Sequence, residues 1–206
     1  MYLEITTRCN MKCDHCCGDY PKEGGDMSME VFMKSMEIVE DYGETVCLGG
    51  GEPTLHPLFR CFVGMGAVMG EGGVFVITNG KDRHEALWLG RLAKRCDLVE
   101  ARLSLDCYRD DRIDDDVIDF FRNRLKYGIR DVSVTVLGFG RGADLVGDVG
   151  ASDCCCSDLW VGHDGKLWAC GCKKIPLGDV FHNTIESRID LLVAYYGSEE
   201  VAENHF

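Results

Sequence analysis

The chain has 206 residues, 46% of them hydrophobic, which is enough for one domain with a buried core. Its formal net charge of -13 argues against a generic nucleic-acid or anionic-membrane partner, because such partners select basic surfaces. No apolar run approaches the roughly 20 residues that span a bilayer, and no signal peptide is evident. The 13 cysteines are therefore interpreted as metal-bound or free thiols in a reducing cytoplasm.

A strand predicted at residues 2–6 leads directly into a cysteine-rich loop with the sequence EITTRCNMKCDHCC. Cys9, Cys13 and Cys16 stand in the spacing C-x3-C-x2-C. Three thiolates can hold three irons of a cubane cluster, whereas clusters built for electron transfer normally take four cysteines. One iron is then left to bind another ligand. The alternatives are chance clustering or a zinc knuckle, but zinc usually takes ligand pairs that close a tetrahedral site.

This loop resembles the cluster loop of the radical SAM superfamily. The resemblance implies a [4Fe-4S] cluster on Cys9, Cys13 and Cys16, with S-adenosyl-L-methionine (SAM) chelated to its free iron. His15 occupies the position where the family usually has an aromatic residue near the adenine, so the resemblance implies a cofactor contact there. A spare metal ligand is the alternative for His15. Cys17 breaks the spacing and is interpreted as a bystander.

Helical and strand-like patterns alternate along the chain after this loop. Ser28 is predicted to cap a helix that ends near Gly43, and Pro57 fits the first turn of a later helix. The other predicted elements are strands at 45–48, 74–78, 98–105 and 131–137 and helices at 84–95 and 114–127. Cysteines in or beside these apolar stretches are interpreted as small buried hydrophobes, namely Cys47, Cys61, Cys96 and Cys107.

This alternation with short connections is typical of a parallel sheet with crossover helices. A complete eight-stranded barrel takes about 250 residues, so this chain is too short for one. We therefore expect an α/β fold, an open or partial (β/α) barrel of five to six units over residues 1–139. The family resemblance implies the same fold.

Unusual segments follow the predicted strands, and ligands of parallel α/β folds bind at the carboxyl ends of strands. The run GGGEP at 49–53 resembles the GGEP motif of radical SAM enzymes. That likeness implies that Gly50, Gly51 and Glu52 bind the methionine amino group of SAM. The alternative for Glu52 is a solvent-exposed loop carboxylate.

Polar residues also follow the third and fourth predicted strands. Thr78 and Asn79 offer polar groups where a ribose or carboxylate of the cofactor would lie. Ser104 and Asp106, in RLSLDCY, resemble the family's serine and acidic positions, which hold the ribose or the methionine carboxylate. The alternative for this pair is an N-cap or a turn.

The rest of the chain is predicted to contain a glycine-rich linker or loop at 140–153 and a cysteine-rich extension at 154–206. Asp-Gly at 164–165 predicts a hairpin between strands at 158–161 and 166–169, and a last helix is expected at 184–196. The spacing G-x4-C from Gly165 to Cys170 resembles the opening of a SPASM or twitch-type extension, which implies an auxiliary iron–sulfur cluster. Its candidate ligands, not all of them used, are Cys154, Cys155, Cys156, Cys170 and Cys172. A structural zinc site and surplus free thiols are the alternatives.

We therefore expect a radical SAM enzyme that reductively cleaves SAM to a 5′-deoxyadenosyl radical. The radical would remove hydrogen from a peptide, protein or small-metabolite substrate, and an electron donor such as flavodoxin or ferredoxin would reduce the cluster. One alternative is a glycyl-radical-enzyme activase, against which the C-terminal cysteines argue. A non-catalytic iron–sulfur or zinc-binding protein is the other. No catalytic acid or base can be assigned from spacing.

Overall fold

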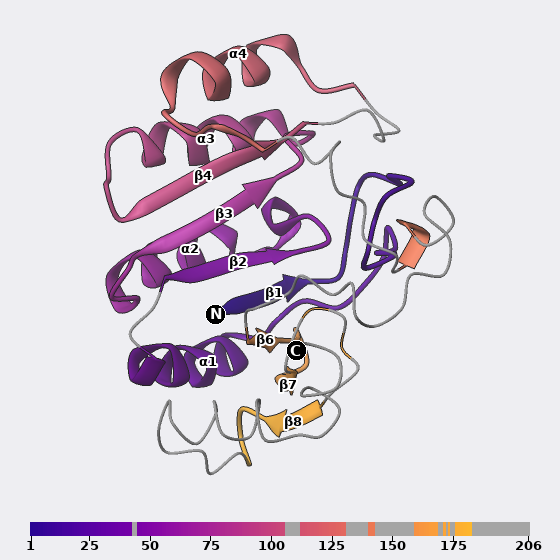
Figure 1. The fold of residues 1–206 in the computed structure, drawn as a ribbon, viewed down its shortest axis with the longest axis vertical. Coiled ribbons are helices and arrows are strands. Elements are labelled where there is room, and N and C mark those ends of the chain that lie inside the picture. The colour runs from indigo at the N-terminus through magenta and orange to yellow at the C-terminus, as the bar shows by residue number, and fades with distance from the viewer. Residues whose placement is uncertain are drawn as a thin grey trace, which may run out of the picture.

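The computed structural model describes residues 1–42, 45–105, 112–130, 140–142, 159–168, 171, 173 and 176–182. Within these residues eight strands form one sheet in the order β5-β4-β3-β2-β1-β6-β7-β8 (Figure 1). The strands are β1 (Tyr2–Thr6), β2 (Val46–Gly50), β3 (Val74–Thr78), β4 (Val99–Ser104), β5 (Ile129–Arg130), β6 (Trp160–Val161), β7 (Lys166–Trp168) and β8 (Pro176–Asp179). The helices are α1 (Met29–Tyr42), α2 (Phe59–Met69), α3 (Arg83–Ala93) and α4 (Asp115–Arg124), with short 3-10 turns η1 (Pro53–Leu55) and η2 (Gly140–Gly142).

Strands β1 to β5 are all parallel, and helices α1 to α4 connect them in turn. On the other edge of β1, β6 is also parallel, and β6, β7 and β8 then run antiparallel. The predicted α/β fold, a partial (β/α) barrel, is confirmed. The predicted hairpin is also confirmed: Trp160 pairs with Trp168, and Gly165 has the positive φ of 84° that its turn requires.

The two faces of the parallel strands differ in burial, and this difference positions the site. One face is fully buried and forms the core with the helices; its residues include Leu3, Ile5, Leu48, Val76 and Leu103. On the other face, residues such as Phe75 and Ile77 of β3 are only partly buried, whereas Glu4 of β1 is fully buried. Because side chains alternate along a strand, the first face carries the packing and the second is left to line a lumen.

Local signals explain where the first helices begin and how they pack. The Val31 N–H donates to the Ser28 hydroxyl at 3.1 Å, which is the predicted N-cap of α1. The buried rings of Phe32 and Phe62 stack with centroids 4.0 Å apart and join α1 to α2. Such aromatic pairs contribute about 0.5–1.5 kcal/mol beyond the area they bury.

The structure differs from the sequence analysis at three places. Pro57 precedes the N-cap of α2, Leu58, instead of lying in the first turn. The fifth strand is Ile129–Arg130 and begins before the predicted range of 131–137, which lies outside the described residues. Strand β8 was not predicted, because its sequence PLGD has no strand-like alternation.

The cysteines interpreted as buried hydrophobes are less buried than expected. Cys61 on α2 is exposed, and Cys47 on β2 and Cys96 after α3 are half-buried. Cys107 lies outside the described residues. The prediction failed for Cys47 because residues of β2 alternate between the core and the lumen, and Cys47 falls on the lumen side.

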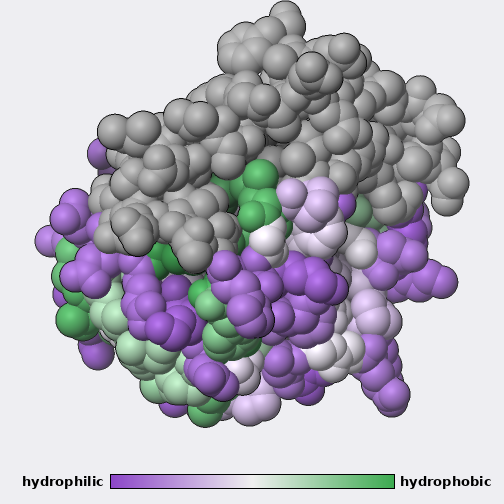
Figure 2. Space-filling model, turned by 90° about the horizontal axis from the view of Figure 1, so that it is seen from below, coloured by the Kyte–Doolittle hydropathy of each residue, from purple (hydrophilic) through white to green (hydrophobic). Residues whose placement is uncertain are grey.

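The described surface is largely hydrophilic on the side shown in Figure 2, with hydrophobic colour confined to smaller areas. This agrees with the excess of acidic over basic residues in the sequence. In the part of the chain that the structure describes, none of the helices combines the length and the apolar character needed to cross a membrane.

Candidate functional site

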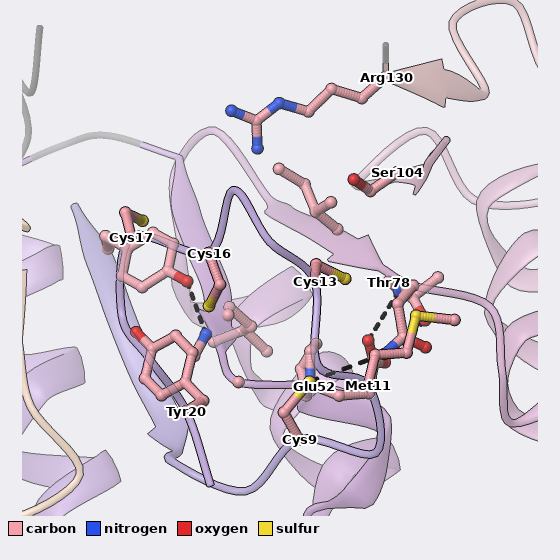
Figure 3. Close-up of a pocket in the computed structure, with 18 of the residues that line it drawn as sticks. Cys9, Met11, Cys13, Cys16, Cys17, Tyr20, Glu52, Thr78, Ser104 and Arg130 are labelled. Atoms are coloured by element: carbon pink, nitrogen blue, oxygen red, sulfur yellow. Dashed lines mark hydrogen bonds between the residues drawn. The ribbon is translucent and has the colours of Figure 1, made fainter. Parts of the chain in front are cut away.

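A cavity opens at the carboxyl ends of the parallel strands, on the lumen side of the sheet (Figure 3). It brings together the predicted residues from four separate segments, which are Cys9, Cys13, His15, Cys16, Gly50, Gly51, Glu52, Thr78, Asn79 and Ser104. Asp106 lies outside the described residues, as do Cys154, Cys155, Cys156, Cys170 and Cys172. The described geometry therefore concerns the site around the N-terminal cysteine loop and not the C-terminal cysteines.

The cysteine loop is held in place by backbone hydrogen bonds as it leaves and returns to β1. The Cys9 N–H donates to the Pro21 carbonyl at 2.8 Å, and the Met27 N–H donates to the Ile5 carbonyl at 2.7 Å. Arg141 Nε donates to the Cys13 carbonyl at 3.0 Å. These contacts order the loop that carries the three sulfurs on one side of the cavity (Figure 3).

The protonation state of one of these thiols follows from its burial. Burial raises the pKa of Cys9 from 9.0 to about 11. The Cys9 thiol therefore keeps its proton at neutral pH in the protein without metal. Because a metal binds the thiolate, loading this position must release that proton.

The glycine run allows the ends of β1 and β2 to approach each other closely. Gly50 has φ 127°, and a Cβ there would lie 2.0 Å from the Thr6 carbonyl oxygen, so only glycine fits. The β2–β3 ladder ends at the pair Leu48 and Val76, before β2 itself ends. The sheet therefore splits beside Gly50, where the cavity lies.

Glu52 is buried and bonded within the chain, so the alternative of a solvent-exposed carboxylate is wrong. Glu52 is only 1% exposed to solvent. The carboxylate accepts hydrogen bonds from the Thr54 hydroxyl at 2.6 Å, the Thr54 N–H at 3.2 Å, the Thr78 hydroxyl at 2.7 Å and the Asn79 N–H at 2.7 Å. Burial raises the pKa of Glu52, and these four hydrogen bonds act in the opposite direction. Glu52 thus joins the end of β2 to the end of β3.

Asn79 extends this connection to the cysteine loop. Its amide nitrogen donates to the Asn10 side-chain oxygen at 2.8 Å, next to Cys9. The Lys81 ammonium donates to the Asn10 carbonyl at 3.0 Å. The segment TNGK after β3 therefore braces the loop that carries the cysteines.

Arg130 lines the cavity but was missed by sequence reasoning. It pairs with Ser104 in the β4–β5 ladder, so a guanidinium and a hydroxyl lie on neighbouring strand ends. Figure 3 shows the Arg130 side chain extended over the cavity. The sequence analysis missed it because the predicted strand began at residue 131, directly after Arg130.

Tyr2 and Trp160 also line the cavity and were not predicted. Their rings stack with centroids 3.8 Å apart, across the junction of β1 and β6. The Tyr2 hydroxyl accepts the Gly50 N–H at 2.6 Å. Burial raises the pKa of Tyr2 well above 10, so this hydroxyl stays protonated. No local pattern could place residue 2 beside residue 160.

His56 connects the turn after Glu52 to the returning cysteine loop, and it yields a prediction about pH. Its Nε2 donates to the Met27 carbonyl at 2.9 Å, while Nδ1 accepts the Leu58 N–H at 3.0 Å, an arrangement that requires neutral imidazole. Burial lowers the pKa of His56 below 6.5. Its contribution to stability is therefore present above pH 6.5 and is lost as the pH falls through the lowered pKa.

We expect the urea midpoint of the wild type to fall between about pH 7.5 and about pH 5.5 more steeply than that of His56→Gln. Glutamine can donate and accept but does not titrate in this range. Parallel pH profiles for the two proteins would contradict the prediction.

Comparison with known proteins places this chain in a wider group. Residues 3–143 match the sequence profile of the Radical SAM superfamily. The chain is 43% identical over 67 residues to the "Tungsten-containing aldehyde ferredoxin oxidoreductase cofactor-modifying protein" of Pyrococcus furiosus, covering 31% of this chain and 19% of that protein. It is 33% identical over 125 residues to the "Antilisterial bacteriocin subtilosin biosynthesis protein AlbA" of Bacillus subtilis, covering 59% of this chain and 26% of that protein. The chain thus spans about a quarter or less of the length of these relatives.

Solved structures resemble the fold over almost the whole chain. The structure of BtrN in complex with AdoMet and 2-DOIA has a TM-score of 0.66 at 17% identity, and covers 98% of this chain and 83% of BtrN. The structure of anSMEcpe with bound AdoMet and Cp18Cys peptide has a TM-score of 0.61 at 16% identity, covering 99% and 81%. At such identities the likeness concerns the fold.

Proposed function

The chain belongs to the radical SAM superfamily, and from this premise we propose that it reductively cleaves SAM to act on a substrate C–H bond. The observation that carries the proposal is the shared cavity. Three thiols in the family's spacing, the glycine run after β2 and the polar ends of β3 and β4 all line it. A protein that used the three cysteines for zinc alone would not need the last three segments.

The donor set fits the cofactors that the family implies. A [4Fe-4S] cluster takes thiolates, and Cys9, Cys13 and Cys16 offer three from one loop whose return is bonded to β1. SAM presents an ammonium, a carboxylate, a ribose and an adenine. The cavity offers backbone groups at Gly50 and Gly51 and charged or hydroxylic groups at its other strand ends.

When bound, the cluster and SAM supply one-electron cleavage of the sulfonium to methionine and a 5′-deoxyadenosyl radical, which removes a substrate hydrogen atom. The residues of the chain would hold these cofactors and orient them toward the substrate. The backbone of Gly50 and Gly51 would meet the methionine amino group, while Glu52 keeps that segment fixed through Thr78 and Asn79. His15, half-buried in the cavity wall, would contact the adenine.

Ser104 and Arg130 would bind the carboxylate or a ribose hydroxyl of SAM. A guanidinium and a neighbouring hydroxyl form strong hydrogen bonds to a carboxylate. Within the described residues the Arg130 side chain has no hydrogen-bonded or ionic partner, so its charge is available to a ligand. Asp106 stays a proposed contact from the resemblance alone.

The C-terminal cysteines are proposed to hold a second iron–sulfur cluster, with a structural zinc site as the alternative. The proposal rests on the spacing of Gly165 and Cys170 and on the cysteine group Cys154, Cys155 and Cys156. We further propose a peptide, protein or small-metabolite substrate and a cytoplasmic electron donor such as flavodoxin or ferredoxin. Relatives whose names mention bacteriocin biosynthesis and a bound peptide favour the peptide class.

The test is SAM cleavage by the reconstituted, reduced protein under anaerobic conditions, with 5′-deoxyadenosine measured by mass spectrometry. We expect product from the wild type and none from the triple variant Cys9/Cys13/Cys16→Ala. Equilibrium SAM binding is measured on the same samples. A protein that assembles the cluster but neither binds nor cleaves SAM would be the non-catalytic iron–sulfur protein instead.

The glycyl-radical-activase alternative predicts a different substrate response. In that case 5′-deoxyadenosine formation would rise when a glycyl-radical enzyme is added and a glycine-centred radical would appear by electron paramagnetic resonance. A rise with candidate peptides, together with a peptide product lighter by two hydrogens, would support the peptide class.

A further inference from the structure

A buried carboxylate lies in the middle of β1, among residues that have no assigned part in cofactor binding. The Glu4 side chain is only 1% exposed to solvent. The residues on either side of it in the strand, Leu3 and Ile5, belong to the hydrophobic core. Proteins bury a charge only when it is paired and hydrogen-bonded. The partners of Glu4 therefore identify the segments that this charge holds together.

Two partners reach Glu4 from opposite ends of the chain. The Tyr20 hydroxyl donates to Oε1 at 2.8 Å, and the Lys173 ammonium donates to both carboxylate oxygens at 2.7 Å. Tyr20 belongs to the N-terminal cysteine loop, and Lys173 directly follows Cys172. One carboxylate is thus bonded to both cysteine-bearing segments.

The neutral partner is held in its donor form. Burial, followed by the neighbouring Tyr2 and Glu4 groups, raises the pKa of Tyr20 well above 10. The hydroxyl therefore keeps its proton and can donate to the carboxylate. The Lys173 ammonium supplies the positive charge that a buried carboxylate needs.

Gly171 and Lys173 both lie close to the ring of Trp160 on β6. A Cβ on Gly171 would lie 2.6 Å from Cζ3 of the Trp160 ring, so this approach requires glycine. The Lys173 ammonium also lies 5.5 Å from the centroid of that ring. Gly171 therefore lies against the junction of β1 and β6, and in the sequence it stands between Cys170 and Cys172.

Glu4 lies where two segments share the edge of β1. Strand β6 pairs with Tyr2 and Leu3 of β1. Further along β1, the Ile5 carbonyl accepts a hydrogen bond from the N–H of Met27, at the end of the cysteine loop. Next to this joint, His163 Nδ1 lies 3.7 Å from Glu4 Oε2. The carboxylate therefore lies between the β6–β7 hairpin and the cysteine loop.

We propose that Glu4 is a positioning residue that fixes the N-terminal cysteine loop and the chain at Gly171 and Lys173 relative to each other. The inference rests on the proposed function only in that the cysteines on these segments are its candidate cluster ligands. Loss of the carboxylate should loosen both segments. Loss of Tyr20 or Lys173 as donor should loosen one segment each.

The experiment maps thiol alkylation in the full chain, reduced and free of iron, by iodoacetamide labelling and peptide mass spectrometry. We expect Lys173→Met to speed labelling of Cys170 and Cys172 by about 10- to 100-fold, because labelling follows local opening. Tyr20→Phe should speed labelling of half-buried Cys16, and Glu4→Gln should speed labelling of Cys16 as well as of Cys170 and Cys172. Exposed Cys61 on α2 serves as the reference whose rate stays constant in every variant.

Three further variants keep the result interpretable. Lys166→Met removes an exposed ion pair to Asp164 in the same hairpin and should leave all rates unchanged. Lys173→Arg keeps two donors for the Glu4 carboxylate, so Cys170 and Cys172 should be labelled as slowly as in the wild type. The double variant Glu4→Gln with Lys173→Met should label Cys170 and Cys172 more slowly than the two single effects multiplied, because it leaves no unpaired charge.

Two outcomes would overturn the proposal. The first is that Glu4→Gln leaves Cys170 and Cys172 labelled as in the wild type, which would mean that the carboxylate does not hold the chain at Gly171 and Lys173. The second is that all cysteines, including exposed Cys61, react faster in Glu4→Gln, Tyr20→Phe and Lys173→Met alike, which would make Glu4 a residue of general stability. None of these readouts uses iron or SAM, so a failure of the radical SAM proposal would leave the labelling pattern intact.

Discussion

Replacing Cys16 by alanine should lower SAM cleavage by at least about 1000-fold, which is a loss of about 4 kcal/mol of transition-state stabilisation. The reason is that Cys16 is one of three thiols proposed to hold the cluster, and a cluster bonded through two cysteines from this loop would be lost or misplaced. Cys9 and Cys13 should behave in the same way. The measurement is 5′-deoxyadenosine formed by reconstituted protein, together with iron and sulfide content.

The matched control is Cys17→Ala, which changes the adjacent residue. Cys17 also lines the cavity, but it is exposed and lies outside the C-x3-C-x2-C spacing. We expect this variant to keep its iron and most of its activity. If Cys17→Ala lost the cluster while Cys16→Ala kept it, the ligand assignment from spacing would be wrong.

Replacing Glu52 by glutamine should lower the free energy of unfolding by about 2–4 kcal/mol, even with no SAM present. The carboxylate accepts from Thr54, Thr78 and Asn79 with both of its oxygens. A glutamine NH2 would face one of these donors and leave it buried without an acceptor, at a cost of about 1–3 kcal/mol, besides the lost charge-assisted bonds. The measurement is urea unfolding, with exposed Glu71→Gln as the control.

The same variant separates two roles for Glu52. If Glu52 acts only as a ligand of the SAM ammonium, Glu52→Gln should weaken SAM binding and leave stability without SAM within about 0.5 kcal/mol of the wild type. If it chiefly joins β2 to β3, stability and SAM affinity should fall together. The four hydrogen bonds inside the chain favour the second result.

The fold could largely be predicted because its elements depend on local periodicity. Strands β1 and β3 coincide with the predicted ranges, and Ser28 caps α1 as its side chain indicates. Prediction failed where the local signal was weak. Strand β5 has two residues and β8 has the sequence PLGD, so neighbouring strands impose their extended conformation.

The sequence by itself determined the cysteine spacing, the glycine run and the polar residues that follow each strand, because covalent order places them at strand ends. Only the tertiary structure decided which of them meet. Glu4 and Lys173 are 169 residues apart, and Arg130 meets Ser104 through the register of β4 and β5. Such pairs depend on strand order and on which face each side chain takes, and no local pattern encodes either. That is why Glu52 could be selected from its motif, while its partners across β3 and the shared carboxylate of Glu4 emerged only from the fold.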